Sequence, residues 1–216
     1  MGLICNCPLA ESLNDVPLYD CPESFGQIQK VLFQRLESAA GKKNKFVKET
    51  NDITKLTSWT AFLSADDGTK IVPSPYINAP TTEPGAARTY GGGNETLDGI
   101  EINIGREPTS FTGSLLREHQ DTIEALKNLQ CEGALGVYLV DGNGMIGALA
   151  DDIKNPTKFS PIPIRGLFVG DKNLGGFENP DSNSIEWKFV PNWSDKLVRI
   201  KPDDFNPLTD LKKAEE

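Results

Sequence analysis

Apolar residues recur three and four positions apart in two stretches of the chain, which is the spacing of an amphipathic helix. The first stretch covers roughly residues 23–40, and Gly41 would close that helix. The second covers about residues 115–131, where Thr112 or Ser114 could cap the start. Its apolar stripe is narrow, so we expect a surface helix with one buried face. Residues 53–64 permit either a three-turn helix or a strand.

Apolar residues that alternate with polar ones predict strands in most of the remaining chain. The clearest alternation is Ile100, Ile102 and Ile104, which predicts a half-buried strand. Asp141–Gly144 has the composition of a hairpin turn. Further strands are expected at residues 71–72, 135–140, 145–149, 162–169, 185–189 and 197–200. Runs of strands around one or two helices indicate an α+β fold, an antiparallel β-sandwich or small barrel flanked by one or two helices.

Proline and glycine interrupt this pattern, and the interruptions predict an N-terminal arm and long loops. We expect an irregular arm over residues 1–22, long loops over 78–99 and 170–184, and a polar, loosely ordered tail after Lys201. The expected division of the chain has three parts: 1–45, the arm with the first amphipathic helix; 46–201, a β-rich domain; and 202–216, the polar C-terminal tail.

Length and charge narrow the classes of function. The chain has 216 residues, which fits one domain, or one domain with an arm, better than two full domains. Its 22 basic and 31 acidic residues give a net charge of −9, which argues against a nucleic-acid groove because such a groove needs a basic stripe. The sequence shows no signal peptide, and no apolar run approaches the ~20 residues of a membrane span, so we expect no membrane insertion.

Four cysteines raise the question of a metal site. Cys5, Cys7 and Cys21 could supply three zinc ligands, with Cys131 or His119 as the fourth. Their spacing contains no CxxC pair, which favours the alternative that they are small buried thiols near a docked N-terminal arm. We therefore expect no metal and no cofactor, and zinc at the first three cysteines stays the weaker hypothesis.

No set of residues has the pattern of a catalytic site, so we expect no catalytic residue and no enzyme. His119 is expected in the middle of the second helix, on its partly buried side. Ser114 does not lie in a G-x-S-x-G elbow. The pairs Asp66–Asp67 and Asp151–Asp152 are typical of solvated turns. Gly91–Gly93 lacks the lysine of a phosphate-binding loop and indicates a flexible turn.

A resemblance to a known group of proteins emerges from several segments. The runs Leu56–Ala61, Asp66–Val72, Pro73–Ile77 and Gly91–Gly105 resemble the virion structural proteins of tailed phages. The likeness is greatest to proteins of the crAss-like phages that infect gut bacteria. It covers residues 50–200, and the first helix with its cysteine-containing arm departs from it.

This resemblance implies a tail-tube or tail-hub subunit, in which a small β-sandwich or barrel is flanked by a helix and a long loop reaches the next subunit. It implies a homo-oligomeric ring in the tail or neck of a virion, made in the host cytoplasm and joined to other tail or connector proteins. DNA would pass through the lumen without sequence-specific binding. The residues expected in the subunit-contact loop are Pro73, Pro75, Tyr76, Gly91, Gly92, Gly93 and Asn94.

Two other functions stay open at this point. One is a small hydrolase that depends on carboxylates or a metal. The other is a carbohydrate-binding module that uses Trp59, Trp187 and Trp193 as stacking surfaces. Trp187 alternates with apolar residues in the 185–189 segment, which favours a place in the core.

Overall fold

The structure is a computed structural model that describes residues 16, 18, 20 and 24–212. The chain divides into two units. The smaller contains Ala86–Glu107. The larger consists of Phe25–Gly85 and the chain from Pro108 onward, and it contains both α-helices of the described residues.

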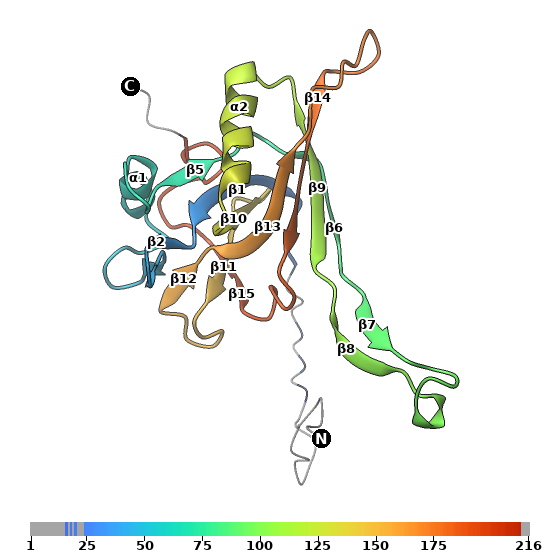
Figure 1. The fold of residues 1–216 in the computed structure, drawn as a ribbon. Coiled ribbons are helices and arrows are strands. Elements are labelled where there is room, and N and C mark those ends of the chain that lie inside the picture. The colour runs from blue at the N-terminus through green and yellow to red at the C-terminus, as the bar shows by residue number, and fades with distance from the viewer. Residues whose placement is uncertain (1–15, 17, 19, 21–23, 213–216) are drawn as a thin grey trace. The chain divides into compact units, whose positions relative to one another are not determined.

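The secondary structure confirms an α+β fold in which antiparallel strands predominate (Figure 1). The helices are α1 (Leu56–Leu63) and α2 (Gln120–Asn128), with short 3₁₀ turns at Leu97–Gly99 and Leu129–Cys131. The strands are β1 (Ile28–Arg35), β2 (Glu37–Ala39), β3 (Lys42–Lys43), β4 (Phe46–Val47), β5 (Ile71–Pro73), β6 (Asn78–Glu83), β7 (Ala87–Tyr90), β8 (Ile102–Arg106), β9 (Thr109–Leu116), β10 (Leu135–Asp141), β11 (Ile146–Ala150), β12 (Lys158–Ser160), β13 (Ile162–Val169), β14 (Ser182–Phe189) and β15 (Leu197–Ile200).

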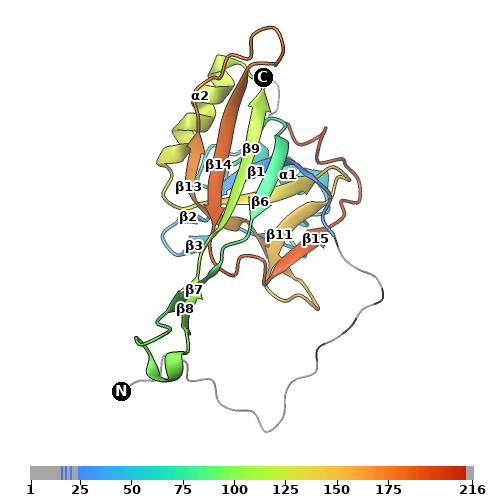
Figure 2. The same ribbon diagram turned by 90° about the vertical axis from the view of Figure 1, so that its right-hand side faces the viewer.

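One eleven-stranded antiparallel sheet forms the larger unit. Its main path is β4-β12-β11-β10-β13-β14-β9-β6, while β1 joins β10 to β5 and β15 pairs with β11. The long strand β10 branches this path, because it pairs with β13 near its start and with β11 near its end. This branching folds the sheet into layers, which Figure 2 shows from the side of β9 and β14.

Strands β1 and β10 lie between two hydrophobic cores. Val31 and Phe33 point into the core shared with β13, β14, β9 and α2, where the Phe33 ring meets Trp187 edge to face at 6.2 Å. The next residue, Leu32, points into the other core, which contains Trp59 of α1 and residues of β11. Because successive strand residues face opposite sides, both faces of β1 are buried.

That double burial explains why the helix expected at residues 23–40 is wrong. A strand buried on both faces has a near-continuous apolar run in place of alternation, and such a run also matches helical spacing. Its polar members have specific partners. The Lys30 ammonium donates to the Leu211 carbonyl at 2.7 Å, and Gln34 Nε2 donates to the Thr69 carbonyl at 2.7 Å.

The remaining strands and helices agree in part with those expected from the sequence. The hairpin of β10 and β11 and the strands β5, β13, β14 and β15 are confirmed, and residues 53–64 contain the helix α1. The helix expected at 115–131 begins only at Gln120, because Leu115 and Leu116 belong to β9. Thr112 and Ser114 also lie in β9, so neither caps a helix.

The loop expected over residues 78–99 and the loose tail after Lys201 are corrected as well. Residues 78–99 contain β6 and β7. The C-terminal segment packs against the core: Leu211 is fully buried, and Phe205 and Leu208 lie against the same cluster. The boundaries 1–45, 46–201 and 202–216 stay a prediction.

Candidate interaction surfaces

The hairpin made by β7 and β8 has an exposed apolar face. Tyr90 pairs with Ile102 across the two strands, and Ile104 is the extra residue where the register shifts, between Asn103, which pairs with Thr89, and Gly105, which pairs with Arg88. With Ile100 and Leu97 near the tip, these side chains are between 42% and 90% exposed. The strand predicted at 100–104 is therefore confirmed, but its expected half-burial within the chain is wrong.

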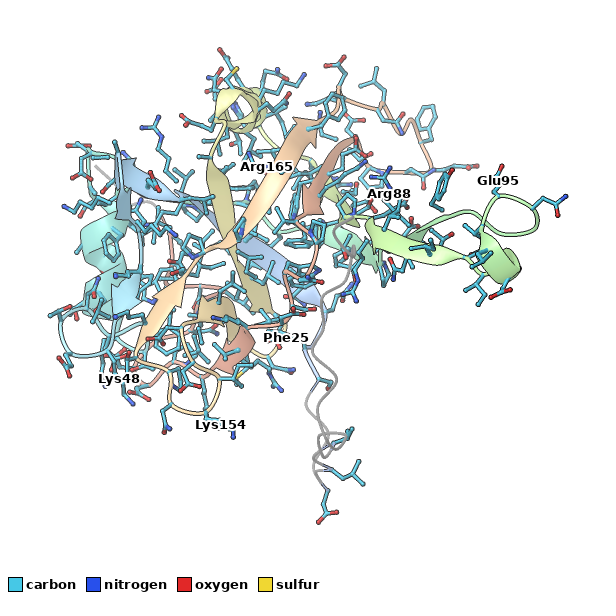
Figure 3. All side chains as sticks on the ribbon, turned by 60° about the horizontal axis from the view of Figure 1, so that its bottom comes forward. Phe25, Lys48, Arg88, Glu95, Lys154 and Arg165 are labelled. Atoms are coloured by element: carbon cyan, nitrogen blue, oxygen red, sulfur yellow. The ribbon has the colours of Figure 1, made fainter. Side chains whose placement is uncertain are left out.

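Glycines shape the tip of this hairpin. Gly91, Gly92 and Gly93 all have positive φ, at 89°, 105° and 56°. A Cβ on Gly91 would lie 2.1 Å from the methyl carbon of Thr96, so only glycine fits there. The Gly92 amide donates to Thr96 Oγ1 at 3.1 Å. The turn predicted here is confirmed, and Figure 3 labels Arg88 on β7 and Glu95 in the tip.

The residues expected to form one subunit-contact loop are divided between the two units. Pro73 ends β5, and the segment that follows is held to β1, since the Ser74 amide donates to the Val31 carbonyl at 2.8 Å. Tyr76 is half exposed, and its hydroxyl donates to the Leu208 carbonyl at 3.0 Å. Pro75 belongs to this docked segment, whereas Gly91, Gly92, Gly93 and Asn94 belong to the hairpin. Their role in subunit contact stays a prediction.

The loop of residues 170–181, between β13 and β14, presents a second exposed apolar pair. Leu174 is largely exposed and Phe177 is fully exposed. The loop is internally braced: Asn173 bridges to Ser182, and the Gly175 amide donates to Asp181 Oδ1 at 3.2 Å. The bracing holds the two apolar side chains outside the core.

An apolar pocket of about 260 Å³ opens elsewhere on the larger unit. Phe25, Ile28, Phe111, Phe189, Trp193 and Leu197 line much of it, and Figure 3 labels Phe25 at its place before β1. Phe189 and Trp193 stack at 4.3 Å between ring centroids. The Arg199 guanidinium carbon lies 5.9 Å from the centre of the Phe25 ring, and its Nε lies 4.0 Å from Asp141.

The histidine and the cysteines do not meet in a site among the described residues. His119 caps α2, where its Nδ1 accepts from the Asp121 amide at 3.4 Å, and its side chain is exposed. Its expected place in the middle of a helix, on a partly buried side, is therefore wrong. Cys131 is an exposed free thiol, while Cys5, Cys7 and Cys21 lie outside the described residues. Within the described part of the chain no group of three potential metal ligands occurs.

The paired carboxylates organise turns. Asp151 accepts from the Thr157 hydroxyl and from the amides of Thr157 and Lys158, and these hydrogen bonds hold its pKa well below the usual range. The pKa of Asp67 is lowered in the same way by the hydroxyl and amide of Thr69. Asp66 and Asp152 flank these turns at exposed positions.

Two of the three tryptophans lie in the core, as expected for Trp187. Trp59 is fully buried and donates from Nε1 to the Ile53 carbonyl at 2.8 Å. Trp187 is buried and stacks on Phe111 at 4.0 Å. Neither ring is free to stack on a sugar, and Trp193 is half-buried against Phe189. A carbohydrate platform built on these three residues is therefore wrong.

Comparisons with known proteins yield distant similarities. No protein-family model matches the chain, and no curated protein matches it. Among solved structures, it is similar to a chain in the tail of an empty GTA particle with C6 symmetry, with a TM-score of 0.32 and 13% identity over 56% of this chain and 80% of that one. It is also similar to a chain in the 6-fold symmetrised baseplate of the anti-feeding prophage, with a TM-score of 0.31 and 10% identity over 85% of this chain and 98% of that one.

The described residues contain no helix that is long and apolar enough to cross a membrane.

Proposed function

We propose that the protein is a structural subunit of a phage-type tail or neck ring, of the tail-tube or tail-hub kind. The observation that carries this proposal is the exposed apolar face of the β7–β8 hairpin. Contiguous exposed apolar surface is typical of a site that another protein covers. A two-stranded hairpin is marginally stable by itself, so a covering partner also holds it in shape.

The size of this face suits an assembly with several contacts per subunit. Full burial of one large aliphatic side chain contributes about 1.5–3 kcal/mol, and the partly exposed residues of this face contribute a fraction of that each. Association costs an estimated 4–15 kcal/mol in lost translational and rotational freedom. One such face therefore gives a weak pairwise contact, whereas a closed ring adds further contacts on each subunit.

Charge agrees with a conduit for DNA. A net charge of −9 disfavours adhesion to phosphates, so a lumen built from such subunits would let DNA pass without sequence-specific binding. In this proposal the protein is located in the virion after synthesis in the host cytoplasm, and its partners are further copies and other tail or connector proteins.

The test compares two double variants of the hairpin. Ile102→Ser with Ile104→Ser, the apolar-face variant, removes two exposed isoleucines, while Arg88→Ser with Glu101→Ser, the polar-face variant, changes two exposed polar positions. Sedimentation velocity over a concentration series, with electron micrographs of the same samples, measures assembly. We expect rings from the wild type and from the polar-face variant, and monomers from the apolar-face variant. Equal assembly of both variants, or a strictly monomeric wild type, would count against the proposal.

A further inference from the structure

We propose that the 170–181 loop of one copy inserts Phe177 into the apolar pocket of a second copy, in a head-to-tail contact. The inference rests on the proposed function and deepens it, because it names a second copy as the partner and gives the contact a direction. It joins two features of the larger unit that the hairpin does not use.

Phe177 is placed as an inserting side chain. It is fully exposed, and Leu174 beside it is largely exposed. The loop is braced by the Asn173–Ser182 bridge and by the Gly175–Asp181 hydrogen bond, so little conformational entropy is lost when it docks. A braced loop that holds an aromatic ring in water has the anatomy of an interface anchor.

The pocket has a matching character. Its volume of about 260 Å³ accommodates an aromatic ring, and its walls include the stacked pair Phe189 and Trp193. Phe25 forms another wall and carries Arg199 against its ring. Aromatic rings pack well against such walls edge to face or with offset stacking.

The 170–181 loop and the pocket lie at opposite ends of β14, so they are two different patches on the surface of one copy. β14 starts at Ser182, directly after the loop, and ends at Phe189 in the wall of the pocket. Eight strand residues span about 26 Å. A contact between different patches on two copies is heterologous, so a pair keeps one free pocket on the first copy and one free loop on the second. Such a contact propagates from copy to copy and suits successive members of a tail assembly.

Charge favours a protein partner of this kind over a membrane. The loop carries Asp171, Glu178 and Asp181 against Lys172, and Lys127 of α2 pairs with Asp171. The remaining charge is acidic, and an acidic loop is repelled by anionic lipid surfaces. The walls of the pocket carry no charged residue, and the cationic Arg199 lies next to Phe25 at its side. Glu178 directly follows Phe177, so insertion of the ring brings a carboxylate toward that guanidinium.

The contact is small. One phenylalanine and one leucine bury far less than the roughly 800 Å² per partner of a standard interface. The loop therefore adds direction to an assembly that other contacts, including the hairpin, also hold together. We expect Phe177→Ala to weaken self-association at least tenfold. Phe168→Ala, which truncates a half-exposed phenylalanine on β13, is the matched control and should change it less than twofold.

Photocross-linking between two distinguishable copies tests both partners at once. The donor carries benzoylphenylalanine at position 177 and Thr82→Trp, which fills the mouth of its own pocket at an exposed position. The acceptor is ¹⁵N-labelled Phe177→Ala with its pocket intact. We expect light–heavy products whose heavy peptides come from Phe25–Ile28, Pro80–Thr82 or Trp193–Leu197, and almost no light–light product. Circular dichroism checks that both variants fold.

The outcomes separate this inference from the proposed function. Cross-links to another surface, none at all, or equal light–light product would overturn the loop-to-pocket contact, even if rings still depend on Ile102 and Ile104. Cross-links at the pocket, together with assembly that is unchanged in the hairpin variants, would support the loop contact and contradict the hairpin-based proposal.

Discussion

Truncation of Leu211 to alanine tests whether the C-terminal segment is part of the core. Leu211 lies in a polar segment, yet its side chain is 0% exposed. It joins the cluster that contains Trp59 and Tyr138, and its carbonyl accepts the hydrogen bond from the buried Lys30 ammonium. Leu211→Ala leaves that backbone carbonyl in place, so the variant isolates the apolar contact.

The expected loss follows from complete burial. Replacement of a fully buried leucine by alanine costs about 2–5 kcal/mol, which combines the lost transfer free energy with the cavity that remains. With a urea m-value of about 2 kcal/mol/M, a loss of about 3 kcal/mol lowers the unfolding midpoint by roughly 1.5 M. Tryptophan fluorescence reports this transition, because Trp59 lies in the same cluster.

The control is Leu174→Ala, the same substitution at a largely exposed position of the larger unit. Measured at a concentration where the protein does not assemble, it should change the free energy of unfolding by less than about 0.5 kcal/mol. If Leu211→Ala falls within that same range, the segment is not packed and the reasoning from burial fails.

Two further predictions concern titratable groups. Asp151→Asn should make the loss of stability in acid less steep. The pKa of this carboxyl group is lower in the folded protein than its value near 3.8 in the unfolded chain, so the ionised group stabilises the fold above pH 3.8, and this contribution is lost as the pH falls from there toward the folded pKa. Urea unfolding of both proteins between pH 7 and pH 2 measures the effect, and a parallel loss of stability in the two would contradict it. Tyr138→Phe should lower the free energy of unfolding by about 1 kcal/mol, because Gln34 Oε1 loses the hydroxyl that donates to it at 3.1 Å. Burial raises the pKa of Tyr138 well above 10, so in the wild type the absorbance of its tyrosinate should appear only when the protein unfolds in alkali.

The sequence predicts those strands of the larger unit that have one buried face or end in a strong turn. β14 alternates from Ile185 through Trp187 to Phe189, and each of these side chains is buried while Glu186 and Lys188 are exposed. The β10–β11 hairpin is predictable because Asp141–Gly144 limits the connection to a tight turn.

β1 was beyond this kind of reasoning for a physical reason. Residues from Lys30 to Gln34 are all buried, so no alternation marks a solvent face. The polar ends of this run are satisfied by the carbonyls of Leu211 and Thr69, which lie 181 and 35 residues away along the chain. Contacts at such separations leave no local signal, and for the same reason burial of Leu211 could not be foreseen.

The sequence does not predict β6, because the prolines and glycines of this region are typical of a loop. Pro80 is tolerated there because β6 pairs only with β9 and forms an edge of the sheet, where one side of the strand needs no hydrogen bonds. The sequence predicts only part of the candidate interaction surfaces. The composition of Gly91–Gly93 predicts the turn at the tip of the hairpin, whereas no local feature of the sequence distinguishes the exposed ring of Phe177 from a buried one.

The error at β8 differs in kind, because the pattern there was read correctly and the burial it implies is missing. Ile100, Ile102 and Ile104 alternate in the sequence as in a strand with one covered face, and the strand exists, yet all three side chains are exposed. An exposed hairpin does not need isoleucine at every second position to stay soluble, and such a row of apolar side chains makes it prone to association. The simplest physical source of the pattern is a covering layer that comes from another molecule. Under the proposed function, the sequence of β8 therefore describes the burial of the assembled state, and the free chain shows the same strand before its partner arrives.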